Sequence, residues 1–190
     1  MPDGDFLDDR RRASEDDYFR KKDRELIEKM RQAAEADRAR TELSTRTGVS
    51  DPALIAELGA LGFTPDTISV LPLVPVVQMA WAEGGITPAE RDLLVRLARG
   101  RGITAGSAAD QQLSDWMSRR PSDEVFSRAT RLIRAMLDTG TAAAASMSAD
   151  DVIKYSESIA AASGGLFGIG KISSEERETL AQIVSALKAR

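Results

Sequence analysis

The chain of 190 residues contains no cysteine and no histidine. Without cysteine there is no disulfide and no thiolate ligand for zinc. Without histidine there is no imidazole ligand, no histidine-based catalytic triad and no side chain that ordinarily titrates near neutral pH. Carboxylates, lysines, hydroxyls and tyrosines are the groups left for chemistry, and we predict a protein that is not an enzyme and uses no cofactor.

Positive charge in excess and long apolar runs are also missing. The formal charge is -4 and the pI is about 5.1, so nothing favours a general affinity for nucleic acid or anionic lipid. The most apolar run, residues 68–82, has 15 residues and contains Pro72 and Pro75, whereas a spanning helix needs ~20 apolar residues. It predicts a buried helix that is kinked or begins at the prolines. The N-terminus lacks the apolar core of a signal peptide, so we expect a cytoplasmic protein.

Charge is abundant near the N-terminus. Between residues 8 and 40, 21 of 33 residues are charged, and neither glycine nor proline interrupts them. Opposite charges recur at i,i+4 spacing, as in Asp17 with Lys21 and Glu25 with Lys29, which favours one long solvated helix. A short apolar stripe on this helix needs a partner to cover it. We predict that residues 1–44 form an arm, and that residues 8–40 dock a protein partner or a second copy. The predicted partner-binding residues are Glu15, Tyr18, Phe19, Arg20, Arg24, Leu26, Ile27 and Met30.

The pattern changes after the arm. Residues 45–51 are small and polar and predict a linker. Residues 52–190 carry apolar side chains at helical spacing, with no sustained strand alternation. Helix starts recur as a capping residue followed by proline, at Asp51, Thr64 and Thr87. We predict an all-α fold: a compact bundle of about seven short helices, preceded by one long charged helix.

Two glycine-rich corners repeat within this bundle. Residues 86–98 and 172–184, which lie 86 positions apart, share an isoleucine, a hydroxyl residue and a Glu-Arg pair, and each follows a Gly-Gly. They predict two helix-corner-helix repeats related by a pseudo-twofold axis. The residues of this motif are Glu83, Gly84, Gly85, Thr87, Glu90, Gly164, Gly165, Gly168, Gly170, Ser173 and Glu176. Thr87 and Ser173 are the expected caps, and Glu90 and Glu176 close the capping boxes.

The second corner also contains a pattern close to a phosphate-binding loop. Residues 165–171 read G-x-x-x-x-G-K, but Ile172 stands where that loop has Ser or Thr. The preceding residues, 150–162, have helical spacing rather than the character of a buried strand, with Ser148 and Asp151 as a capping pair. We therefore interpret the segment as a corner between helices and keep a nucleotide hydrolase as the weaker alternative.

The corners resemble those of the tellurite-resistance TerB-like family. The resemblance rests on Ala82, Glu83, Gly84, Ile86 and Glu90, with a weaker second copy that ends at Glu176. It covers about residues 52–190 and implies an all-helical binding or scaffold module linked to stress response. Acidic surface residues of that family are proposed to bind metal. Because Glu83 stands where aspartate is usual and Ser163 replaces the second acid, we assign no metal ligand.

A second, shorter resemblance lies in the arm. Residues 15–31 are similar to the inhibitory segment of the mitochondrial ATP-synthase inhibitor protein, through acid-acid-x-Tyr-Phe-Arg and Arg-Glu at matching intervals. It implies that Tyr18 and Phe19 insert into a rotary ATPase, surrounded by Glu15, Arg20 and Arg24. The chain departs from that family in having no histidine with which to sense pH. An inhibitor of a rotary ATPase is therefore the alternative function.

Two further groups of residues receive structural interpretations. Arg128, Arg131 and Arg134 repeat at i,i+3 spacing and predict an exposed helix face, because no aromatic residues alternate with them as in nucleic-acid-binding surfaces. Trp81 and Trp116 stand in apolar helical contexts, and we predict that both belong to the core.

Overall fold

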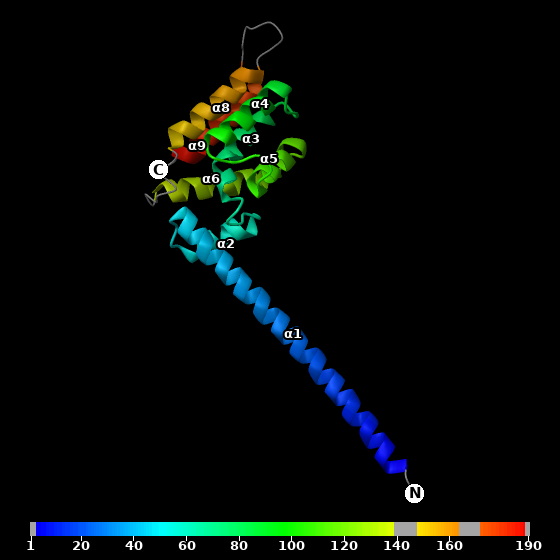
Figure 1. Cartoon of the computed structure of the whole chain (residues 1–190). Coiled ribbons are helices and arrows are strands. Elements are labelled where there is room, and N and C mark those ends of the chain that lie inside the picture. Colours follow the sequence, from blue (N-terminus) through cyan, green and yellow to red (C-terminus); the bar gives the residue numbers. More distant parts are fainter. Residues whose placement is uncertain (1–2, 139–147, 164–171, 189–190) are drawn as a thin grey trace. The chain divides into compact units, whose positions relative to one another are not determined.

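A computed structural model describes residues 3–138, 148–163 and 172–188 (Figure 1). The chain divides into two compact units, residues 1–41 and 42–190. All regular structure within these described ranges is helical, and the first element is the long helix α1 (Asp3–Thr47). The predicted all-α class and the long charged helix at its start are confirmed.

Seven α-helices and one short 3-10 helix follow α1 in the described part of the chain, which confirms the predicted number of about seven. They are α2 (Pro52–Ala60), η1 (Ile68–Leu73), α3 (Val74–Ala80), α4 (Pro88–Gly100), α5 (Ala108–Ser118), α6 (Asp123–Asp138), α8 (Ala149–Ser163) and α9 (Ser174–Lys188). In the second unit, α3 packs against α4, α6, α8 and α9, and α8 also packs against α4 and α9 (Figure 1).

The apolar run 68–82 supplies the centre of this bundle. It forms η1 and α3, and six of the seven residues of α3 are buried. Pro72 lies inside η1 and Pro75 in the first turn of α3, where its missing N–H leaves no helical hydrogen bond unmade. The predicted buried helix that breaks at its prolines is confirmed. Full burial of a side chain such as Val76 or Leu73 contributes about 1.5–3 kcal/mol each, so this short segment is a main source of stability.

Local chemistry explains which of the predicted helix starts exist. Asp51 caps α2, since its Oδ1 accepts a hydrogen bond from the Ala53 N–H at 2.8 Å, and Pro52 fills the first turn. The prediction of an α-helix at Thr64 is wrong, because the chain makes a turn there and continues into η1. The hydroxyl of Thr67 accepts from the Thr64 N–H at 2.9 Å, so Thr64 is held by the turn instead of capping a helix.

The predicted linker, residues 45–51, is helical in its first part. α1 continues to Thr47 and stops at Gly48, whose φ of 69° suits a glycine at a helix end. Leu43, Thr47 and Val49 are buried within the second unit, and the Thr47 hydroxyl donates to the Leu43 carbonyl at 2.7 Å. The second unit begins at Glu42, so the last three residues of the predicted arm, 42–44, lie in it. Apolar packing of Leu43 and Val49 explains why this segment is ordered.

Candidate functional site

The stripe on the arm consists of Tyr18, Phe19, Leu26, Ile27 and Met30, and we call it the arm stripe. These side chains keep between 58% and 65% of their surface exposed, and they are the large apolar side chains that stand out as exposed among the described residues. The other predicted partner-binding residues, Glu15, Arg20 and Arg24, are exposed as well. The structure therefore brings all eight onto the surface of one helix, α1.

The helix under the arm stripe is supported by local polar contacts. Lys22 pairs with Glu25 at 3.7 Å and Arg40 with Asp37 at 2.9 Å, and the Gln32 amide donates to Glu28 at 3.1 Å. Each contact of this kind contributes about 0.2–0.5 kcal/mol on an exposed helix. The predicted pairs Asp17–Lys21 and Glu25–Lys29 are not within ion-pair distance, and the ion pairs of this stretch of the described chain are i,i+3 apart. The arm thus forms its helix without an apolar core of its own.

The aromatic end of the arm stripe has a defined local geometry. The rings of Tyr18 and Phe19 meet edge to face, with centroids 5.9 Å apart and planes at 72°. The Lys22 ammonium lies 5.8 Å from the centre of the Tyr18 ring, a cation–π contact. These contacts leave both rings more than half exposed. The pair therefore offers a large apolar surface whose side chains are already held in position before a partner binds.

The first corner contains the predicted capping box. The Glu90 carboxylate accepts from the Thr87 N–H and hydroxyl, both at 2.7 Å, and the Glu90 N–H donates to the Thr87 hydroxyl at 3.3 Å. Gly84 has a φ of 85°, which a residue with a Cβ adopts only under strain, whereas Gly85 does not need this conformation. Glu83, Gly84 and Gly85 are exposed, while Glu90 is buried. Thr87 and Glu90 therefore stabilise the start of α4.

The second corner repeats the same cap. The Ser173 N–H donates to the Glu176 carboxylate at 2.8 Å, the Glu176 N–H donates to the Ser173 hydroxyl at 3.1 Å, and Glu176 is buried. Gly164, Gly165, Gly168, Gly170 and Lys171 lie outside the described residues. The chain before them is the helix α8, begun by the predicted capping pair of Ser148 and Asp151, whose hydroxyl and carboxylate lie 2.9 Å apart. A phosphate-binding loop would follow a buried strand there.

The pKa of the buried Glu90 depends on its surroundings, which include Glu176 of the second corner. Burial raises the pKa of Glu90 above its ordinary value of 4.5, hydrogen bonds from Thr87 oppose this shift, and the charges of Glu176 and Glu83 add to it. The two capping carboxylates therefore lie close enough for their charges to interact, although they belong to corners far apart in sequence. Among the described residues, no group of three or more acidic side chains is arranged to hold a metal ion.

The predicted arginine face is used partly inside the bundle. Arg128 on α6 donates to Glu57 on α2 at 3.1 Å and to Glu124 one turn earlier at 3.2 Å, so it joins two helices. Arg134 lies 3.6 Å from Asp138. Arg131 is exposed, and none of the ion pairs in the described chain involves it. The predicted exposed face is therefore correct for Arg131 but not for Arg128.

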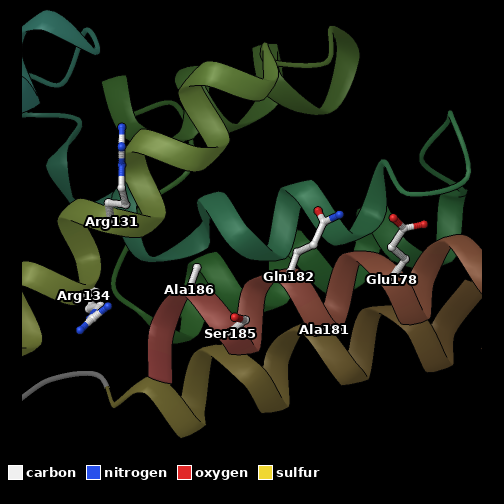
Figure 2. A pocket seen from close by; sticks show the side chains of 7 residues that line it. All are labelled: Arg131, Arg134, Glu178, Ala181, Gln182, Ser185 and Ala186. Atoms are coloured by element: carbon white, nitrogen blue, oxygen red, sulfur yellow. The ribbon is translucent and has the colours of Figure 1, made fainter. Parts of the chain in front are cut away.

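A groove lies between α6 and α9 that the sequence did not reveal. Its volume is about 680 Å³. Figure 2 shows that Arg131 and Arg134 come from α6 and the other lining residues from α9. The α9 wall is formed by Glu178, Ala181, Gln182, Ser185 and Ala186. The spacing of Arg131 and Arg134 was visible in the sequence, but nothing in the sequence indicated that these arginines lie across a groove from α9.

The two tryptophans are partly buried rather than fully internal. The Trp81 indole N–H donates to the Trp116 carbonyl at 2.9 Å, and the Trp116 ring meets Phe63 edge to face at 5.8 Å. Both rings pack against the core of the second unit, which agrees with their predicted structural role.

Comparison with known proteins gives no family for the chain, because no family model, curated protein or solved structure matches it. No helix of the described residues is long and apolar enough to cross a membrane.

Proposed function

We propose that this protein is a binding module without enzymatic activity, in which the N-terminal helix docks a protein partner or a second copy. The observation that carries this proposal is the arm stripe, whose five large apolar side chains are 58–65% exposed. Apolar surface gathered on one helix face is typical of an interaction site. In the described part of the second unit, the large apolar side chains belong to one buried cluster or pack against it.

Simple energetics set a requirement for the partner. Burying one large apolar side chain contributes about 1.5–3 kcal/mol, whereas association costs roughly 4–15 kcal/mol in lost freedom of motion. One covered side chain does not offset that cost, and two, at about 3–6 kcal/mol, reach only its lower end. A partner must therefore cover most of the arm stripe at once, as a groove or a second helix does.

The proposal includes a TerB-like role for the helical domain, with a cytoplasmic location and a link to stress response such as tellurite resistance. Support comes from the two corners: Thr87 with Glu90 and Ser173 with Glu176 form matching caps, and the helices α3, α4, α8 and α9 that they connect pack together. The family resemblance and the pseudo-twofold relation remain predictions.

Affinity capture with two matched variants tests the docking proposal. The stripe variant Phe19→Ser/Leu26→Ser/Met30→Ser removes the apolar surface, whereas the control Lys21→Ser/Glu28→Ser/Glu35→Ser makes three serine substitutions on the opposite face of the same helix. We expect the parent chain and the control to retain a protein, or a second copy of the chain, that the stripe variant releases. Equal retention by all three proteins would contradict the proposal.

Inhibition of a rotary ATPase is the second candidate function. The exposed ring pair of Tyr18 and Phe19, with exposed Arg20 and Arg24 beside it, is a suitable anchor for an interface, because aromatic and arginine side chains dominate binding energies. Full-length protein added to purified ATP synthase should then slow ATP hydrolysis, and Tyr18→Ser/Phe19→Ser should not. No effect of the parent chain would remove this candidate.

Nucleotide hydrolysis at residues 165–171 has the weakest support. The preceding segment is the helix α8, and no strand occurs in the described residues. Nucleotide binding that the Lys171→Ala variant abolishes would establish this function, and no binding by the parent chain would end it.

A further inference from the structure

The side chains along one edge of the arm stripe follow the spacing of a two-helix seam. Phe19, Asp23, Leu26, Met30, Ala33 and Asp37 are separated alternately by four and three residues, and we call this set the arm seam. All six are exposed. A second helix laid along the arm seam would therefore bury Leu26 and Met30 at its centre, with Ile27 next to them.

The sizes of the seam residues are unequal at its two ends. Phe19 is large, whereas Ala33 and its neighbour Ala34 are small. If two arms paired in parallel, Phe19 would face Phe19 and Ala33 would face Ala33, so one end would be crowded and the other would leave a gap. Antiparallel pairing with Leu26 opposite Met30 sets each Phe19 against Asp37, and each Ala33 against Asp23, of the second copy. Phe19 then does not meet Phe19, and Ala33 does not meet Ala33, so the distance between the two helices is more even than in parallel pairing.

The charges of the arm seam favour the same orientation. Parallel pairing would set Asp23 against Asp23 and Asp37 against Asp37, and like charges at an interface disfavour association. In the antiparallel register, Asp23 faces Ala33, and Asp37 faces Phe19, with Arg20 and Lys22 of the second copy within one turn of it. The register also sets Lys29 beside Lys29 of the second copy. That contact lies at the solvated edge, where screening keeps the repulsion small.

We propose that the arms of two copies pair antiparallel through the arm seam, about a twofold axis beside Ile27, so that this chain forms a homodimer. This inference rests on the proposed docking function and names its partner. A twofold contact is self-complementary, since each pairing occurs twice. Leu26, Ile27 and Met30 of both copies are covered together, which meets the requirement that most of the arm stripe be buried at once.

The absence of native cysteine makes disulfide trapping a direct test. Two full-length variants, Asp23→Cys and Ala33→Cys, are made with different masses and equilibrated in a glutathione buffer, separately and mixed. We expect the mixture to form the crosslinked pair of unlike chains, and each variant alone to remain largely uncrosslinked. The matched control mixes Lys21→Cys with Glu35→Cys, which lie at the same heights on the opposite face and should not crosslink.

Each result decides between arrangements. Crosslinking of each variant with itself, in equal yield to the mixture, would indicate parallel arms and overturn the proposal. No crosslinking, together with the mass of a monomer in sedimentation of the parent chain, would also overturn it. If the affinity capture then shows a different protein that the parent chain retains and the stripe variant releases, the docking function stands without the homodimer. If no capture depends on the arm, both the docking function and the homodimer are wrong.

Discussion

The two units of the chain use the same kinds of apolar residue in opposite ways. In residues 1–41 the large apolar side chains described are exposed, whereas every buried hydrophobic side chain described lies between Leu43 and Leu187. The arm helix depends on helix propensity and short-range polar contacts, each of a few tenths of a kcal/mol. The bundle depends on burial, at about 1.5–3 kcal/mol for each large side chain. The second unit therefore has a core of its own, and the first unit has the apolar surface that is available for binding.

Substitution of one leucine in each unit should show this difference most strongly. Leu94 in α4 is fully buried, and Leu26 in α1 is 58% exposed. Leu94→Ala should lower the free energy of unfolding of the bundle by about 2–5 kcal/mol, because it leaves a cavity. Leu26→Ala should change it by less than about 0.5 kcal/mol, as surface substitutions do. Urea denaturation measures both, and equal losses would show that the arm stripe is part of the core.

Truncation from the N-terminus locates the boundary between residues that stabilise the bundle and residues that do not. A chain that begins at Glu42 should unfold cooperatively and with nearly the stability of the parent. A chain that begins at Thr45 loses Leu43, which is 3% exposed, and should be less stable by roughly 2–3 kcal/mol. Thermal and denaturant unfolding of the two fragments test this. Equal stability of both fragments would instead favour the linker predicted at residues 45–51.

The segment between the two units, with its buried Leu43, is an example of what the sequence alone does not predict. The cap of Glu90 on Thr87 was predictable because both residues lie within one turn of each other. The anchoring of Leu43 was not, since its neighbours are small and polar and its burial depends on packing with distant segments. The bridge from Arg128 to Glu57 spans 71 residues, and the groove brings Arg131 and Arg134 of α6 together with residues of α9 that lie far from them in the sequence. Contacts between residues within one helical turn could be predicted from the sequence, whereas contacts between distant segments could not.

Capping provides a smaller effect that is confined to the bundle. Thr87→Ala removes the acceptor for the Glu90 N–H and a donor to its carboxylate, and should lower the stability of the bundle by about 1 kcal/mol. Thr87→Ser keeps the hydroxyl and serves as the control. Neither change should alter the pairing of the arms in sedimentation. If Thr87→Ala abolished the pairing of the arms, pairing would depend on the first corner, which would contradict the separation of the stable bundle from the binding arm.

The pH dependence of stability should separate Glu90 from two partly buried aspartates. Because the folded chain raises the pKa of Glu90, its contribution is fully present below the ordinary value of 4.5 and is lost as pH rises through the folded pKa. Asp110 and Asp151 have lowered pKa values, caused first by hydrogen bonds from Gly106 and Ser148, so their contributions are lost as pH falls. Glu90→Gln should abolish the first dependence and leave the second. If the difference in unfolding free energy between the parent chain and Glu90→Gln stayed the same at every pH, this assignment would be refuted.

The central claim is that the arm stripe remains uncovered until a second protein binds it. Amide hydrogen exchange along the full-length chain, measured over a dilution series, tests this most directly. At concentrations where sedimentation shows a monomer, residues 15–40 should exchange far faster than α3, and their exchange should slow as copies associate. Protection of residues 15–40 equal to that of α3 in the monomer would mean that the chain covers its own stripe, and would contradict the account.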